Sequence, residues 1–237
     1  MAKQRSLGQY RAIDLGCFVL MLALFEPVLH FTATRLFPAE PYTVSVTAAV
    51  TAVVMMRWGP WAAIHAVFGG ILACFLSKAR ADQYLIYGLG NLFAMAALLL
   101  LKKWGKEETR KEVLHSIAFA LMTALLMQLG RAVMALILGN GLLLCLGFFT
   151  TGVITDLFTV VVIWIARRLD GIFEDQIHYL LRISQGRFHH GHGPSGRRGH
   201  RRRHRAEPGR PLLPHWVLQP DLGGDAEDRP QVPGRAG

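Results

Sequence analysis

Residues 45–76 read SVTAAVTAVVMMRWGPWAAIHAVFGGILACFL. This stretch carries one charged side chain at neutral pH, that of Arg57, and is otherwise apolar, small or uncharged. Gly59 and Pro60 stand near its middle, and both residue types interrupt helices. We therefore expect two apolar helices joined by a tight turn, the first over about residues 43–56 and the second over residues 58–76.

Further apolar runs of about 18 to 25 residues flank this pair, and each is long enough to cross a hydrocarbon layer of about 30 Å. The expected fold class is therefore all-α, a polytopic membrane protein with a six-transmembrane-helix bundle in residues 1–166. The six predicted spans are 12–34, 43–56, 58–76, 84–101, 113–138 and 142–166. The second span has only about 14 residues, so it either extends into the Pro38–Pro41 segment, is partly re-entrant, or lies among the other helices.

Composition excludes several classes of protein. The chain has 237 residues, of which 52% are hydrophobic, and its mean hydropathy is +0.31, which excludes an ordinary soluble enzyme. All three cysteines lie inside apolar runs, which excludes a disulfide scaffold. The sequence contains no H-E-x-x-H, G-x-S-x-G or Walker motif and no clustered metal-ligand spacing. We expect no catalytic activity, no cofactor and no metal.

The charge distribution predicts how the chain sits in the membrane. The net charge of +10 suggests nucleic acid at first sight, but half of it lies in the last 53 residues, so no nucleic-acid partner is expected. Lysine and arginine favour the cytoplasmic side. With six spans, most basic loop residues fall on the side of both termini: Lys3, Arg5, Arg11, Arg57, Lys102, Lys103, Lys106, Arg110, Lys111, Arg167 and Arg168. We expect a multi-pass plasma-membrane protein whose termini are both cytoplasmic.

The start of the chain also permits a different interpretation. A basic segment followed by an apolar run is typical of a cleaved signal peptide. The apolar run here is too long for one, and Glu26–Pro27 interrupts it. We therefore interpret residues 12–34 as a retained span.

Polar side chains inside the predicted spans are the candidate site. An ionisable group in hydrocarbon is costly and usually faces a cavity or a partner. At a rise of 1.5 Å per residue, most of these groups fall in the outer half of the membrane, as a pocket open to the outside requires. The candidate solute-binding residues are Glu26, His30, Asn91, Gln128, Arg131, Thr151 and Asp156. The alternatives are a structural Glu26–Arg131 ion pair, interhelical hydrogen bonds from Asn91 and Gln128, and a Thr151 hydroxyl bonded to its own helix.

Small residues spaced by four predict helix contacts. Ala62, Ala66 and Gly70 form such a row, which we expect to pack inside the bundle. Ala12 and Gly16 form a shorter row on the first span, which we expect to face a partner protein.

The Ser45–Leu76 pattern resembles the substrate-binding membrane subunit, or S component, of energy-coupling-factor (ECF) transporters. In that family a turn of the G-P-x-x-G type joins the second and third helices. The likeness covers residues 10–183, although Ala63 stands here where the family pattern has glycine. It implies capture of a vitamin-like solute from outside, a covering loop over Leu36–Tyr42, and partnership of the Ala12–Gly16 face with a membrane scaffold subunit and its ATPase subunits.

Two other functions remain open on the residues alone. One is a self-sufficient proton-coupled secondary transporter, with Asp156 or Glu26 as the proton site. The other is a non-transporting membrane protein that assembles other proteins through its cytoplasmic end.

The C-terminal part differs from the bundle. Residues 167–184 have apolar positions at helical spacing, which predicts a cytoplasmic amphipathic helix on the lipid surface or against a partner. Residues 185–237 contain ten arginines and no lysine and are rich in glycine, proline and histidine, which predicts a disordered tail. Its alternatives are weak metal binding at 189–192, contact of Arg197–Arg205 with anionic lipid or RNA, and an out-of-frame translation without a selected function.

Overall fold

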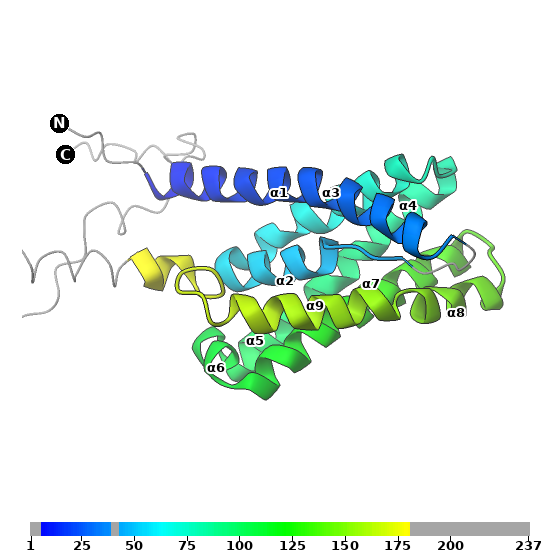
Figure 1. Ribbon diagram of the computed structural model, residues 1–237. Helices are drawn as coiled ribbons and strands as arrows, with labels where there is room; N and C mark the ends of the chain where they lie inside the picture. Colours follow the sequence, from blue (N-terminus) through cyan, green and yellow to red (C-terminus); the bar gives the residue numbers. More distant parts are fainter. Residues whose placement is uncertain (1–5, 39–42, 181–237) are drawn as a thin grey trace, which may run out of the picture. The chain divides into compact units, whose positions relative to one another are not determined.

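The computed structural model describes residues 6–38 and 43–180, and every regular element in that part of the chain is a helix (Figure 1). The expected all-α class is confirmed there. Part of the predicted covering loop, residues 39–42, and the predicted tail, residues 185–237, lie outside the described residues.

Five helical stretches in the described chain are long and apolar enough to cross a membrane. They are α1 (Leu7–Leu36), α2 (Thr47–Trp58) with the 3₁₀ helix η1 (Gly59–Ala62) and α3 (Ala63–Leu76), α4 (Ala81–Gly90) with η2 (Asn91–Ala97) and α5 (Leu98–Trp104), α7 (Val113–Ile137), and α8 (Leu142–Thr151) with α9 (Val153–Ala166). The short α6 (Lys106–Lys111) joins α5 to α7. The second stretch contains the predicted third span and all of the predicted second span except residues 43–46, which precede α2.

The second stretch folds back on itself. Thr47 and Gly69 are twenty-two residues apart, which in a continuous helix would separate them by about 33 Å. Instead, a Cβ atom added to Gly69 would overlap the Thr47 side chain. The reversal occurs at Gly59, whose φ of 62° and ψ of −123° favour glycine, and Pro60 then opens η1. The predicted helix break is confirmed, whereas the count of six membrane crossings stays a prediction.

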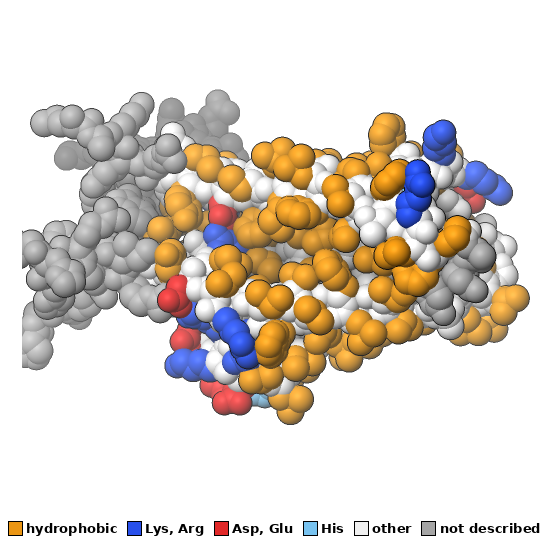
Figure 2. Space-filling view, in the orientation of Figure 1, with side chains coloured by type: hydrophobic (Ala, Val, Ile, Leu, Met, Phe, Trp, Pro, Cys, Tyr) orange, Lys and Arg blue, Asp and Glu red, His pale blue; other side chains and the backbone are white. Residues whose placement is uncertain are grey.

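Helix α2 is the central element. All twelve of its residues are buried, and it packs against α3, α7 and α9. In contrast, only 17% of the apolar window of α1 is buried within the protein. The exposed large apolar side chains lie along the helices, and Figure 2 shows them as a band between charged groups at the two ends of this face. Such a band suits a lipid environment.

Two carboxylates on α1 hold it against both ends of α2. Glu26 Oε2 accepts a hydrogen bond from the Val46 backbone N–H at 3.0 Å, where α2 begins. Asp14 pairs with Arg57 at 2.5 Å and accepts a hydrogen bond from Trp58 Nε1 at 2.6 Å, where α2 ends. The two helices therefore run antiparallel, and their contact depends on polar groups at two separate levels.

Close approaches at glycine join the middle helices. A Cβ atom added to Gly130 of α7 would overlap the Gly90 carbonyl oxygen at the end of α4. One added to Gly70 of α3 would overlap the Tyr87 carbonyl oxygen. Together with the buried Ala62 and Ala66, Gly70 confirms that the predicted row of small residues packs inside the bundle.

The other row of small residues behaves differently. Ala12 and Gly16 are exposed, and nothing lies within 4 Å of a Cβ atom added to Gly16. The described chain thus leaves this face of α1 uncovered, and its expected role in binding a partner stays a prediction.

The segment after α9 differs from the predicted continuous helix. Residues 167–175 form turns and bends, and helix resumes only at residues 176–180, while the rest of the predicted helix lies outside the described residues. Gly171 has a φ of 76°, and Phe173 is fully buried with its ring 6.3 Å from that of Phe119. An apolar anchor and a glycine turn therefore override the helical periodicity.

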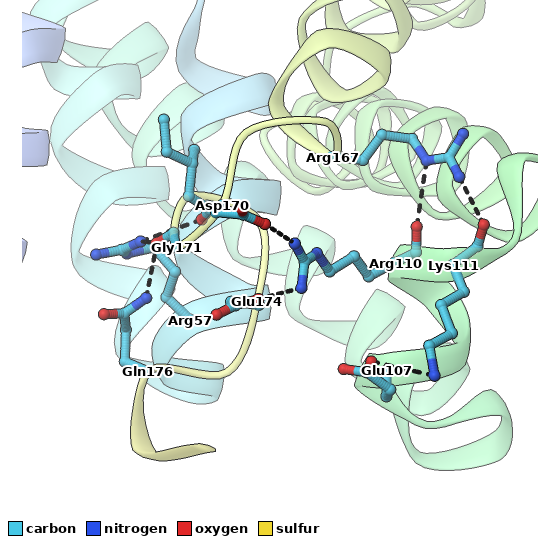
Figure 3. Close-up of polar contacts among 10 residues, drawn as sticks. Arg57, Glu107, Arg110, Lys111, Arg167, Asp170, Gly171, Glu174 and Gln176 are labelled. Atoms are coloured by element: carbon cyan, nitrogen blue, oxygen red, sulfur yellow. Dashed lines mark hydrogen bonds and ion pairs between the residues drawn. The ribbon is translucent and has the colours of Figure 1, made fainter. Parts of the chain in front are cut away.

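Ion pairs and hydrogen bonds fasten this segment to α2 and α6 (Figure 3). Arg57 donates to the Gly171 carbonyl oxygen and, at 3.1 Å, to that of Ile172. Arg110 of α6 pairs with Glu174 and, at 2.7 Å, with Asp170. We call this end of the bundle the basic end, because its contacts centre on Arg57 and Arg110.

Replacing Asp14 with alanine should destabilise the bundle by about 3 kcal/mol, because the largely buried Arg57 guanidinium would lose its carboxylate. Asp82→Ala removes a half-buried partner of the exposed Arg80 and should cost less than about 1 kcal/mol. Equilibrium unfolding in detergent measures both changes. Equal losses for the two variants would show that the Asp14–Arg57 pair does not fasten α1.

Gly130→Ala should also lower the unfolding free energy, because its added methyl group would overlap the Gly90 carbonyl oxygen and push α4 away from α7. Gly147→Ala serves as the control, since nothing lies within 4 Å of a Cβ atom there. Thermal unfolding of the two variants tests the contact. A midpoint for Gly130→Ala that matches the control would contradict it.

Candidate functional site

A cavity of about 360 Å³ lies at the end of the bundle opposite the basic end. We call this end the cavity end. It is formed where α1 ends, α2 begins and α3 turns into α4. Of the predicted site residues, Glu26, His30 and Arg131 line this cavity. The remaining lining groups include hydroxyl, amide, thiol and aromatic side chains, contributed by Thr34, Thr43, Ser45, Thr47, Cys74, Ser77, Gln83, Phe37 and Tyr87.

Glu26 enters the cavity from α1 and is only 2% exposed. Its Oε2 accepts from the Val46 backbone N–H at 3.0 Å and from the Thr47 hydroxyl at 3.5 Å. No side chain of α2 caps the start of that helix. Ser45 Oγ accepts from the Thr47 backbone N–H at 3.1 Å, so this hydroxyl and the carboxylate of α1 together cap the helix, and the carboxylate meets the positive end of the helix dipole.

Arg131 reaches the cavity from α7 and is 9% exposed. Its Nε donates to Asn91 Oδ1 at 2.8 Å, and its Nη1 donates to Gln128 Oε1 at 3.2 Å. The Tyr87 ring covers one face, with its centroid 4.6 Å from Cζ of Arg131. Within the described chain, Nη2 has no hydrogen-bond partner. Two acceptors thus hold the guanidinium, and its Nη2 group stays available as a hydrogen-bond donor.

The other polar residues form a layer behind Arg131. Asn91 is fully buried and also donates through Nδ2 to the Ala66 carbonyl oxygen at 2.9 Å, so it joins α3 to α7. Gln128 Nε2 lies 3.5 Å from Asp156 Oδ1 and connects α7 to α9. Asp156, for which the sequence suggested no partner, therefore has one. These three residues support Arg131 and are not among the residues that line the cavity.

Thr151 lies apart from this group. It lines a second, smaller cavity of about 220 Å³, which shares Thr43, Gln83 and Tyr87 with the first. Its hydroxyl donates to the Gly147 carbonyl oxygen at 2.9 Å, as the alternative from the sequence predicted. Its own carbonyl oxygen accepts from the Thr43 N–H at 3.1 Å, so Thr151 helps to position the start of the α2 segment.

The structural ion pair considered between Glu26 and Arg131 is not formed in the described part of the chain. Both side chains line one cavity, yet each takes its hydrogen bonds from other groups. Two opposite charges therefore face the same space without neutralising each other by direct contact. Among the lining residues, only these two are an aspartate, glutamate, lysine or arginine.

Sequence reasoning missed several contributors. Tyr87 lies within an amphipathic run that gave no sign of its contact with Arg131, and Ser45 and Thr47 read as ordinary small residues. Asp14 was overlooked because it stands near the start of the first span. A search for a carboxylate and an arginine placed at matching heights on neighbouring spans would have paired Asp14 with Arg57.

The chemistry that this site offers is binding. Charged, hydroxyl and aromatic groups surround a space of a few hundred cubic ångströms, which is typical of a small-molecule pocket. In the described residues, no group of three or more His, Cys, Asp or Glu side chains is placed to hold a metal ion. Comparison with known proteins finds no matching family model, no similar curated protein and no similar solved structure.

Asn91→Ala should destabilise the protein by about 1–3 kcal/mol, because it leaves Arg131 Nε buried without its acceptor and frees the Ala66 carbonyl oxygen. Asn140→Ala provides a matched control, since that side chain is partly buried at a loop and bonds only the Ala135 carbonyl oxygen. Thermal unfolding of both variants in the same detergent gives the difference. A loss no greater for Asn91→Ala than for Asn140→Ala would contradict this role of Asn91.

Proposed function

We propose that this protein is an integral membrane subunit that captures a small, vitamin-like solute from the outside of the plasma membrane. In this proposal it works with a membrane scaffold subunit and ATPase subunits, as the substrate-binding subunits of ECF transporters do. The observation that carries the proposal is the cavity that both Glu26 and Arg131 line without forming an ion pair with each other in the described chain. Charged groups buried in an apolar bundle usually mark a ligand pathway or binding site.

The size and place of the cavity support solute capture. Its volume of about 360 Å³ lies within the range of small-molecule pockets. It lies at the end of the bundle, among the ends of helices and their loops, so a solute has a short path to it. The segment after Leu36, which the resemblance implies as a cover, leads directly into its lining at Phe37 and Thr43.

The distribution of basic residues supports the proposed orientation. Arg57, Arg110 and Arg167 all make contacts at the basic end. Basic residues favour the cytoplasmic side, so the cavity end would face outward. On this arrangement α2, which is buried among its neighbours and shorter than the hydrocarbon layer, and α3 count as the second and third of six spans, and both ends of the bundle sequence lie on the cytoplasmic side.

The exposed face of α1 supports a role for a membrane partner. Ala12 and Gly16 are exposed, nothing in the described chain lies within 4 Å of a Cβ atom added to Gly16, and small residues allow another helix to approach closely. The sequence has no nucleotide-binding motif of the Walker type, which is consistent with an energy source on another subunit.

Affinity purification of the full chain from its native membrane tests the proposal, with mass spectrometry of the retained proteins and small molecules. The expected result is a membrane scaffold protein, ATPases and one enriched compound of low molecular mass. Recovery of the compound without ATPases would favour the self-sufficient secondary transporter. Recovery of neither would overturn the proposed function.

Filling the cavity should abolish capture of the compound. Ala73→Phe adds a ring at a cavity-lining position of α3 and should reduce the amount of retained compound at least about tenfold, because the ring occupies the space that the solute needs. Ile71→Phe is the control, since Ile71 is exposed on the same helix and does not line the cavity. Undiminished retention by Ala73→Phe would place the solute elsewhere.

A further inference from the structure

We infer that the solute is a zwitterion of amino-acid size, with a carboxylate that binds Arg131 and a protonated amine that binds Glu26. This inference rests on the proposed function and specifies the chemical class of the ligand. It follows from how the two charges are anchored and from what they leave open.

Each charge is held by hydrogen bonds to other residues of the bundle. Glu26 Oε2 takes the Val46 N–H and the Thr47 hydroxyl at the start of α2. Arg131 binds Asn91 and Gln128 through Nε and Nη1, and Gln128 in turn lies within 3.5 Å of Asp156. Both side chains are thus fixed in place before any ligand arrives, which reduces the entropy that binding must overcome.

Each charge also keeps binding capacity toward the cavity. Nη2 of Arg131 has no partner in the described chain, and a guanidinium binds a carboxylate best through its planar edge. The Tyr87 ring covers one face of the guanidinium and leaves its edge free for approach in the plane of the group. Glu26 is an acceptor for a protonated amine, and the hydroxyl groups of Ser45 and Thr47 lie on the same cavity wall.

The pairing of opposite charges selects against ligands with a single charge. An anion bound at Arg131 would lie in the same small cavity as the Glu26 carboxylate, and a cation bound at Glu26 would lie beside Arg131. Repulsion between like charges within one partly buried cavity weakens the binding of such ligands. A zwitterion satisfies both groups and adds no net charge to the interior.

The cavity volume limits the size of this ligand. About 360 Å³ accommodates a compound of amino-acid size together with a few waters, and is too small for a peptide of several residues. Its lining mixes hydroxyl groups with the apolar Ala33, Phe37 and Val44, so a side chain of modest size and mixed polarity fits.

Three matched panels test the inference on the purified full chain. The first contains the free amino acids with uncharged side chains, the second their N-acetyl derivatives, which carry only the negative charge, and the third their methyl esters, which carry only the positive charge. Thermal unfolding is recorded with each compound. We expect one or more free amino acids to raise the unfolding midpoint, while the corresponding derivatives bind at least about tenfold more weakly, since each lacks one charged hydrogen bond.

Glu26→Gln tests whether Glu26 binds the protonated amine of the ligand. The amide oxygen still accepts the Val46 N–H, so the start of α2 keeps its cap while the negative charge is lost. The variant should bind the free amino acid about tenfold more weakly and should accept the N-acetyl derivative, which the original chain rejects. The control Glu107→Gln alters an exposed carboxylate of α6 and should change neither affinity.

The outcomes separate this inference from the proposed function. If an N-acetyl derivative or a methyl ester binds the original chain as well as the free amino acid does, the zwitterion is wrong although a solute site exists. If no panel binds while the native purification yields an enriched compound, the inference is overturned and the proposed function survives. If that purification also yields no compound, both are overturned.

Discussion

The contact between α1 and α2 determines where Glu26 and the cavity lie. Two carboxylates, Asp14 and Glu26, meet opposite ends of one buried helix, and few apolar side chains of α1 are buried between them. Because Glu26 helps to cap α2, it cannot move without exposing the start of that helix. The cavity lies beside this contact, between α1 and the helices around α2. Glu26, which fastens α1 to the start of α2, therefore also lines the candidate site.

Arg131, like Glu26, both takes part in the packing of the helices and lines the cavity. A guanidinium in an apolar bundle requires several acceptors, and Asn91 and Gln128 supply them from η2 and α7. The close approach at Gly90 and Gly130 brings the backbone of α4 against the residue that precedes Arg131. Backbone packing thus places the side chain, and the polar layer behind it fixes its direction. The same residues thus stabilise the bundle and line the cavity in which we propose that the solute binds.

Hydropathy and helix-breaking residues were enough to predict the helices within a few residues and the reversal at Gly59–Pro60. Depth counting also brought Glu26 and Arg131 to one level, where the structure has its cavity. The remaining features depend on contacts between distant segments. The periodic residues of 167–184 suggested a surface helix, whereas Phe173 packs on Phe119 and Gly171 turns the chain beneath Arg57. Likewise, the sequence around Asp14 does not predict its ion pair with Arg57, because the two residues meet only when α1 lies along α2.

The complete burial of α2 has a consequence for how the protein is made. Twelve helical residues rise about 18 Å, which is much less than the thickness of a hydrocarbon layer. A nascent chain threaded into a bilayer one helix at a time would have no stable stopping point at α2. With η1 and α3 it forms a helical hairpin, so on the proposed topology we expect the two helices to enter the bilayer as one unit, with Arg57 at the bend left on the cytoplasmic side. By connecting α2 closely to α3, the tight turn at Gly59 would therefore affect membrane insertion as well as the folded structure.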